Sequence, residues 1–387
     1  MLPKTIKKSL LASAVLGSMV AMPAAAQDLD WGFGGYVKLD TFVSDYADGP
    51  APASGNIGRQ FYIPSVTPVG GQGDDLVTDF HARQSRFFFT AGQELENGKK
   101  ITGRIELDFL TVPVGDERIT NSYAPRIRQA FLTYDGWTFG QAWSNFQDLT
   151  ILPESVDFVG ATDGMAFMRQ TQIKYDAGNG FSASIENPET TVTPNGGGAR
   201  ITSSDGFVPD FTAKYVHKSD GFHFAVAGLL RQLAYDVSGA QDDETATGYG
   251  INVSTKYMLG KNDVRFSVVH GSGIGRYVGL NTFNDAVIDG NGELETIDVT
   301  GFTFAYRHVL SETTRMNFVA TRGWTDNDVA LIGTSGTEYT QRLAVNMMYS
   351  PTPKLTFGVE LSQATRETEA GIDGDLNRLH FMAMYSF

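Results

Sequence analysis

The 387-residue sequence contains no cysteine. A framework of disulfide bonds, which many exported soluble proteins use, is therefore excluded. The absence is compatible with a closed β-sheet, in which backbone hydrogen bonds join every strand to two neighbours.

Long apolar runs are missing after the first 26 residues. A membrane helix needs about 18 or more consecutive apolar residues, so none is expected. Residues 1–26 have a basic start, an apolar stretch from Leu10 to Met22, and Ala24-Ala25-Ala26 at their end. This pattern predicts a secretory signal peptide over residues 1–26 and a mature chain over 27–387. An exported chain without a membrane helix is either soluble or crosses a membrane with strands.

Basic residues are outnumbered: 30 Lys and Arg stand against 44 Asp and Glu, for a formal net charge of −14. Such acidity argues against nucleic acid as a partner. The six histidines fall into no Ser/His/acid pattern and no His-x-x-x-His spacing. The sequence therefore predicts no catalytic site, no metal site and no cofactor.

The C-terminal residues 378–387 read as a β-strand that ends the chain on an aromatic residue. Alternate side chains of a strand share a face, so Leu379, Phe381, Tyr385 and Phe387 lie on one side. A strand at the end of the chain needs a neighbour on each side. In a closed barrel the missing neighbour is the first strand of the sheet.

Short and long connections alternate along the chain. The seven short ones include Asn97-Gly98 and Asp135-Gly136, which are strong hairpin signals. The long ones are polar and rich in Gly and Pro, over about 44–82, 111–124, 144–166, 187–208, 232–246, 272–295, 324–338 and 366–376. Sixteen strands follow, each about ten residues long. The prediction is an all-β transmembrane antiparallel β-barrel with short periplasmic turns and long extracellular loops.

Two other β architectures compete with this interpretation. A soluble sandwich would show the same alternation of apolar and polar residues, with its apolar face turned inward. A propeller would explain tyrosines recurring about every forty residues, from Tyr134 to Tyr385. Each forty-residue period holds two long strands rather than the four short ones of a propeller blade. The tyrosines instead resemble an aromatic girdle at a membrane interface.

Within a barrel, charged residues on strands must face the lumen, because a basic residue in lipid costs about 2–4 kcal/mol at mid-depth. The residues expected to line the pore are Lys38, Arg86, Arg104, Arg126, Arg128, Arg169, Arg265, Arg307 and Arg342. A row of such groups attracts anions and offers paired donors to carboxylates. Alternatively, the arginines pair with lumen acids and only brace the wall.

The long connection at 144–166 combines acids with apolar residues, which indicates a loop that folds against protein. Inside the barrel it would constrict the pore; alternatively, it packs over the mouth or on another subunit. Its acids are expected to face the arginines across the narrowest point, and they are Asp148, Glu154, Asp157 and Asp163.

Five segments resemble the DcaP-like trimeric porins of Gram-negative outer membranes. They are Gly35–Asp40, Arg83–Phe87, Pro125–Ala130, Phe139–Ser144 and Arg169–Tyr175. The resemblance covers nearly all of the mature chain, and the last two segments are the most specific. It implies a sixteen-stranded homotrimeric channel that passes small anionic solutes, dicarboxylates among them, without energy input.

By the same resemblance, Arg86, Arg126, Arg128 and Arg169 are expected to line the pore. The N-terminal coiled coil of some family members is not expected, because about six residues separate Gln27 from Phe33. Lipid and lipopolysaccharide are the expected surroundings. The function expected is a passive anion-selective porin. A general porin without anion preference and a structural or adhesive barrel with a plugged lumen are the alternatives.

Overall fold

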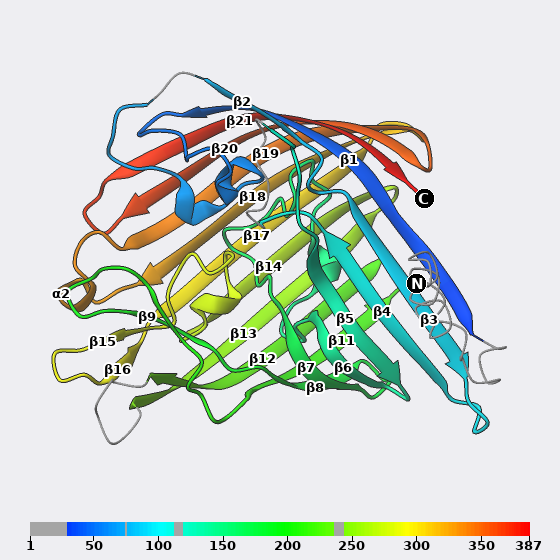
Figure 1. Cartoon of the computed structure of the whole chain (residues 1–387), viewed down its shortest axis with the longest axis horizontal. Coiled ribbons are helices and arrows are strands. Elements are labelled where there is room, and N and C mark those ends of the chain that lie inside the picture. The colour runs from blue at the N-terminus through cyan, green and yellow to red at the C-terminus, as the bar shows by residue number, and fades with distance from the viewer. Residues whose placement is uncertain (1–28, 74–75, 112–118, 236–243) are drawn as a thin grey trace, which may run out of the picture.

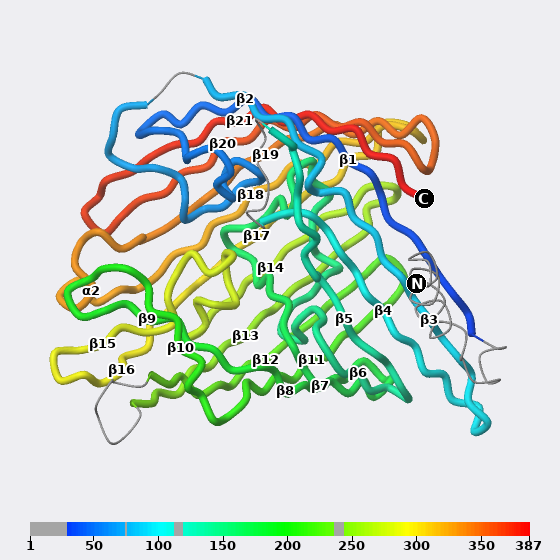
Figure 2. Tube along the Cα trace, in the orientation of Figure 1, coloured from blue at the N-terminus to red at the C-terminus, as the bar shows by residue number. Residues whose placement is uncertain are grey.

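The computed structural model describes residues 29–73, 76–111, 119–235 and 244–387, and the signal peptide predicted at 1–26 lies outside them. The main sheet is antiparallel, and strand β1 (Asp30–Tyr46) closes it. On one side β1 pairs with β21 (Asp373–Ser386), from Tyr36 opposite Ser386 to Tyr46 opposite Leu376. Both Figure 1 and Figure 2 show these two strands side by side. The predicted closure of the last strand on the first is confirmed.

On its other side β1 pairs with β2 (Val77–His81) and then β3 (Arg86–Glu94). Strands β2 and β3 are successive segments of one interrupted strand. The 17 assigned strands of the sheet therefore form a 16-stranded barrel. The others, in chain order, are β4 (Lys100–Asp108), β5 (Arg126–Tyr134), β6 (Trp137–Trp143), β7 (Arg169–Asp176), β8 (Phe181–Glu186), β11 (Asp210–Ser219), β12 (Phe222–Tyr235), β13 (Glu244–Leu259), β14 (Asn262–Ser272), β17 (Asp298–Val309), β18 (Thr314–Asp326), β19 (Thr337–Thr352) and β20 (Leu355–Thr368).

The barrel wall is uneven in height. Strands β3 to β8 have 6 to 9 residues. Strands β12 to β21 of the wall have 11 to 16. We call the first group the low wall.

The seven short turns lie where the sequence predicts them, all on one rim. At Asp135-Gly136 both residues have positive φ, 49° and 84°, as a two-residue hairpin of this kind requires. Two predicted loops are too long. Strands β12 and β13 extend to Tyr235 and from Glu244, and only residues 369–372 separate β20 from β21. The polar residues of these two segments belong to strands and form hydrogen bonds across them, as Thr365 does with Asp375. Their polarity was therefore wrongly interpreted as a sign of a loop.

Most apolar side chains of the wall face outward and most charged ones inward; Arg322 on β18 is an exception, exposed on the outer face. On β1, Phe33, Val37 and Leu39 are exposed, whereas Lys38 and Asp40 are buried. A soluble sandwich would have the opposite arrangement. Aromatic residues lie on the outer face beside the short turns, where Trp137 packs on Tyr175 with 4.8 Å between ring centroids. The outer surface of the described wall is therefore the one suited to lipid.

The long connections at the other rim carry small elements of their own. Four short strands form a second sheet: β9 (Thr190–Thr193), β10 (Ile201–Ser203), β15 (Ala286–Ile288) and β16 (Leu294–Thr296). Single helical turns lie at η2 (Ile57–Arg59), η3 (Pro64–Val66), η4 (Leu149–Ile151), η5 (Gly275–Tyr277) and α2 (Val329–Ile332). Among the described residues, no helix has the length and apolar character needed to span a membrane.

The orientation of the wall generates a prediction about stability. Leu343 is 60% exposed near the middle of β19, and Leu259 is exposed at the last position of β13, beside a short turn. Leu343→Arg is expected to lower the free energy of unfolding by about 2–4 kcal/mol, and Leu259→Arg by about 0–1 kcal/mol. Urea unfolding of protein folded into lipid vesicles measures both. Equal costs at the two positions would contradict this placement of the membrane.

Candidate functional site

The connection between β6 and β7, residues 144–168, runs along the inner face of the barrel, and we call it the inner loop. Near its start Asp148 accepts hydrogen bonds from Ser254 Oγ on β13, at 2.6 Å, and from the backbone N–H of Thr150. A nitrogen of His223 on β12 lies 2.8 Å from the same carboxylate. The bond to Thr150 also caps η4. This part of the loop is thus fixed to the inner face of two tall strands.

The middle of the inner loop is bound by residues from opposite sides of the closure. Glu360 on β20 accepts from Ser155 Oγ at 2.9 Å and from the backbone N–H of Val156 at 3.0 Å. Lys38 on β1 donates to the carbonyl oxygen of Val156 at 2.7 Å. Glu154 forms an ion pair with Arg315 on β18. The loop therefore reaches across the barrel to the first strand and to β18 and β20.

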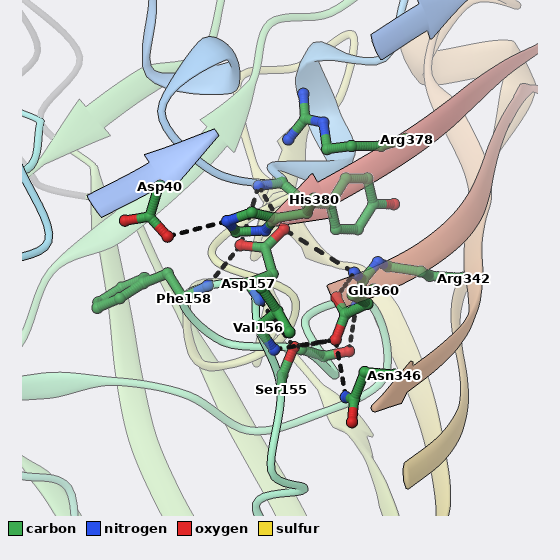
Figure 3. A network of polar contacts seen from close by, with 12 residues as sticks. Asp40, Ser155, Val156, Asp157, Phe158, Arg342, Asn346, Glu360, Arg378 and His380 are labelled. Atoms are coloured by element: carbon green, nitrogen blue, oxygen red, sulfur yellow. Dashed lines mark hydrogen bonds and ion pairs between the residues drawn. The ribbon is translucent and has the colours of Figure 1, made fainter. Parts of the chain in front are cut away.

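The second half of the inner loop is also bound to the barrel wall. Arg342 on β19 donates to the carbonyl oxygen of Gly160 and, at 2.6 Å, to Glu360 (Figure 3). The backbone N–H of Gly164 donates to Thr321 at 2.8 Å. A Cβ added to Gly164 would lie 2.1 Å from the carbonyl oxygen of Phe302. Only glycine lets the loop approach the wall this closely.

A second connection, of which the structure describes residues 47–73 and 76, packs on the inner loop through Phe61 and Tyr62. Tyr62 donates its hydroxyl to Asp163 at 2.7 Å and its backbone N–H to Asp157 at 3.1 Å. Burial raises the pKa of the Asp163 carboxyl to about 6, although the hydrogen bond from Tyr62 favours the ionised form. The ring of Phe61 lies 4.9 Å from that of Phe158. The inner loop is thus enclosed between this connection and the barrel wall.

Opposite the anchored strands, the low wall carries a group of basic residues that we call the arginine cluster. Its five arginines lie on four strands: Arg86, Arg104, Arg126, Arg128 and Arg169. Two carboxylates on β4 lie among them. Glu106 pairs with Arg104 at 2.7 Å and Arg128 at 2.8 Å, and Asp108 pairs with Arg126 at 2.8 Å and Arg128 at 3.0 Å. Five guanidinium groups and two carboxylates leave three positive charges in excess.

Arg128 owes its place to a β-bulge. Glu106 pairs with Gln129 and Leu107 with Ile127, so Arg128 is the extra residue between them. Arg128 and Gln129 are both buried, although they are consecutive. Alternation alone puts consecutive residues on opposite faces, so sequence reasoning missed the inward position of Gln129.

Arg169 differs from the other members of the cluster. It forms no ion pair with any residue that the structure describes, and its buried Nη1 has no hydrogen-bond partner there. Its guanidinium carbon lies 5.0 Å from the centre of the Trp143 ring. Arg169 is therefore the arginine with the greatest unused capacity for an anion.

Aromatic rings cover the arginine cluster, and sequence reasoning did not single them out. The guanidinium carbons of Arg128 and Arg86 lie 5.1 and 5.8 Å from the ring centre of Phe158, in the inner loop. Trp143 lies 5.9 Å from Arg128. A cavity of about 250 Å³ is lined by these rings, by Arg86 and Arg128, and by Lys38. The signal available in the sequence was the aromatic residues within and beside an unusually apolar loop.

The structure divides eight of the nine predicted pore residues into two groups and leaves Arg307 in neither. Arg86, Arg104, Arg126, Arg128 and Arg169 come together in the arginine cluster. Lys38, Arg265 and Arg342 instead bind the inner loop, Arg265 by donating to the carbonyl oxygen of Leu152 while Asp263 on its own strand holds the guanidinium. Arg307 lies 3.4 Å from Asp263, away from the cluster.

The four predicted acids do not form a row facing the arginine cluster. Asp148 and Glu154 bind the tall wall, and Asp157 and Asp163 bind Tyr62. The expectation of a transverse field from these acids therefore differs from the geometry. The physical reason is that a carboxylate taken out of water must find donors nearby, and the nearest ones belong to the surface on which the loop lies.

Comparison with solved structures places the fold among outer-membrane channels. The chain is similar to the outer membrane channel DcaP of Acinetobacter baumannii, with a TM-score of 0.76 and 23% identity over 93% of this chain and 98% of that one. OmpT of Vibrio cholerae gives a TM-score of 0.56 and 11% identity over 93% and 98% of the two chains. OmpF of Salmonella typhi gives 0.53 and 12% over 93% and 97%.

A search of curated protein sequences finds no match. The family model described as DcaP outer membrane protein matches residues 82–387, well over half of the chain. The resemblance noted in the sequence is confirmed. The closed 16-stranded barrel and its outward apolar face are the fold expected for a member of the matched family. The chain belongs to the DcaP outer membrane protein family, whose barrels are channels of the Gram-negative outer membrane.

Proposed function

We propose that the protein is a passive porin for small anionic solutes, dicarboxylates among them, which pass between the inner loop and the arginine cluster. The observation that carries the proposal is the excess of three positive charges in that cluster. A guanidinium group offers two parallel N–H donors that match a carboxylate. Several guanidinium groups on neighbouring strands give a solute with two carboxylates two places to bind.

Passage requires that an anion be attracted and then released. Glu106 and Asp108 favour release of the anion, because they already form ion pairs with Arg104, Arg126 and Arg128. An entering carboxylate competes with these internal partners, which weakens its binding. Arg169, without an internal partner among the described residues, supplies the attraction.

The inner loop acts in this proposal as the constriction. Anchors on both sides of the closure hold it, and Phe158 projects from it toward Arg86 and Arg128. The aperture is bounded by an aromatic ring on the loop and by charged groups on the wall. Such a boundary favours planar anions over bulky neutral solutes.

A homotrimer is part of the proposal. A tilted strand needs about 9–11 residues to cross the bilayer. Strands β6 to β8 have only 7, 8 and 6 residues, which suits a wall covered by protein rather than by lipid. A solved structure of the similar OmpT of Vibrio cholerae is described as a trimer form. The tall wall from β12 to β21 is left to face lipid and lipopolysaccharide.

The sign of the ion selectivity tests the charge of the proposed path. In planar bilayers under a salt gradient, the reversal potential is expected to have the sign of anion preference, because the narrowest path carries the arginine excess. A potential of the opposite sign would favour a general porin governed by the acidic loops, since the chain has a net charge of −14. A barrel with a plugged lumen would give no conductance steps.

Arg169→Gln tests the contact with the solute. It is expected to lower dicarboxylate flux about tenfold in vesicles and to leave the flux of a neutral sugar nearly unchanged, because a charged hydrogen bond contributes about 1.5–3 kcal/mol. Arg322→Gln on β18 is the matched control, since Arg322 is exposed on the outer face of the barrel. Equal losses for both solutes would count against the charged path.

Phe158→Ala tests the constriction. Removal of the ring is expected to raise single-channel conductance and to admit larger neutral sugars, because Phe158 narrows the space in front of Arg86 and Arg128. Phe211→Ala, on the exposed outer face of β11, is the control. An unchanged conductance would show that the narrowest point lies elsewhere.

A further inference from the structure

A second cavity, of about 630 Å³, lies beside the short turns on the inner side of the low wall. Its lining comes from Trp143 at the end of β6, from β7, β8, β11 and β12, from the turn at 178–180, and from the first residues of the inner loop. Because it reaches the short turns, it opens toward the rim opposite the long loops. The anchored start of the inner loop, from Ser144 to Thr150, forms its other boundary.

Three lysines line this cavity. Lys174 and Lys214 project into it from either side of β8, and Lys218 lies near the end of β11, beside the short turn. Lys174 on β7 is opposite Ser184, and Lys214 on β11 is opposite Ser182. The neighbours of Lys174 in its strand, Ile173 and Tyr175, are exposed on the outer face, so Lys174 points inward. The two ammonium groups therefore belong to one surface of the lumen.

Neither the Lys174 nor the Lys214 ammonium group forms an ion pair within the described ranges, although the carboxylates of Asp148, Glu186 and Asp176 are near enough to attract Lys214. The Lys214 ammonium group donates to the carbonyl oxygen of Gln147 at 3.0 Å, and that of Lys174 makes no hydrogen bond to a described residue. The cavity has two acids, and both are engaged. Asp148 binds Ser254, Thr150 and His223 as described above, and Asp176 accepts from the backbone N–H of Gly178 at 2.9 Å.

The cavity adjoins the candidate pore at Trp143. Trp143 lines both this cavity and the smaller one in front of Arg86 and Arg128. A solute that leaves the arginine cluster toward the short turns therefore passes Trp143 and meets Lys174 and Lys214. The same order holds in reverse for a solute that enters from that rim.

We propose that Lys174 and Lys214 form a second binding site for small carboxylates, on the short-turn side of the inner loop. This inference rests on the proposed function, because it assigns a further step to the same path. An ammonium group is a compact, strongly hydrated charge without the fixed fork of a guanidinium. An ammonium group binds a carboxylate without requiring a fixed orientation. The lysine site is therefore expected to bind and release a carboxylate more readily than the arginine cluster does. Two sites in series let an anion move by short exchanges.

The test is the transient block of ion current by a dicarboxylate such as succinate, added to one side of a planar bilayer at a time. Side-specific protease cleavage of a long loop gives the orientation of each channel. The double variant K174Q/K214Q is expected to slow block from the short-turn side at least fivefold and to leave block from the long-loop side unchanged. The control K261Q/K354Q removes two charges from short turns outside the cavity.

The outcomes separate the two proposals. If K174Q/K214Q matches the control on both sides, or slows block equally from both sides, the lysine site is overturned and the arginine path stands. If the unaltered channel shows no block from either side, both proposals fail. The single variant K174Q guards against misfolding, because Lys174 has no hydrogen bond to lose among the described residues, and it is expected to give a partial effect on the same side.

Discussion

The structure depends on the rule that no backbone N–H or carbonyl group is left unpaired in lipid. Closure of β1 on β21 satisfies this rule by removing both edges of the sheet. Once the sheet is closed, one face meets lipid and the other encloses water, and each residue of a strand is assigned to one of the two. The exposed Leu39 and the buried Lys38 and Asp40 on one strand express that assignment.

Charged side chains that face inward determine how the lumen is arranged. On the tall side they bind the inner loop, as Arg342 and Glu360 do with both side chains fully buried. Loss of one partner from a buried pair costs about 3–5 kcal/mol, because the other charge is left without compensation. The inner loop is thus a fixed part of the barrel rather than a swinging segment. On the low side the five arginines of the cluster outnumber its two acids.

The sequence was sufficient for the features that depend on local pattern. Alternation, hairpin residues and the terminal aromatic residue predicted the barrel, its closure and all seven short turns. Loop limits at 232–246 and 366–376 were wrong, because strands continue beyond the membrane with polar residues that pair across them. The sequence could not show which arginines bind the inner loop and which belong to the arginine cluster. That distinction depends on contacts between distant residues, such as that of Arg342 with Gly160, 182 residues away in sequence. The lysine pair of β7 and β11 was missed for the same reason: only the folded lumen brings Lys174 and Lys214 onto one cavity.

The bulge in β5 has a consequence for how the pore keeps its charge. Because Arg128 and Gln129 both turn inward, they approach Glu106 together, at 2.8 Å to one oxygen and 3.1 Å to the other, while Arg104 donates to the second oxygen at 2.7 Å. Both oxygens are thereby occupied, and the carboxylate has no free rotation with which to follow a neighbouring cation. A single inserted residue thus brings two neighbouring side chains onto one carboxylate, and the Glu106 charge is held in a defined position among the arginines of the cluster.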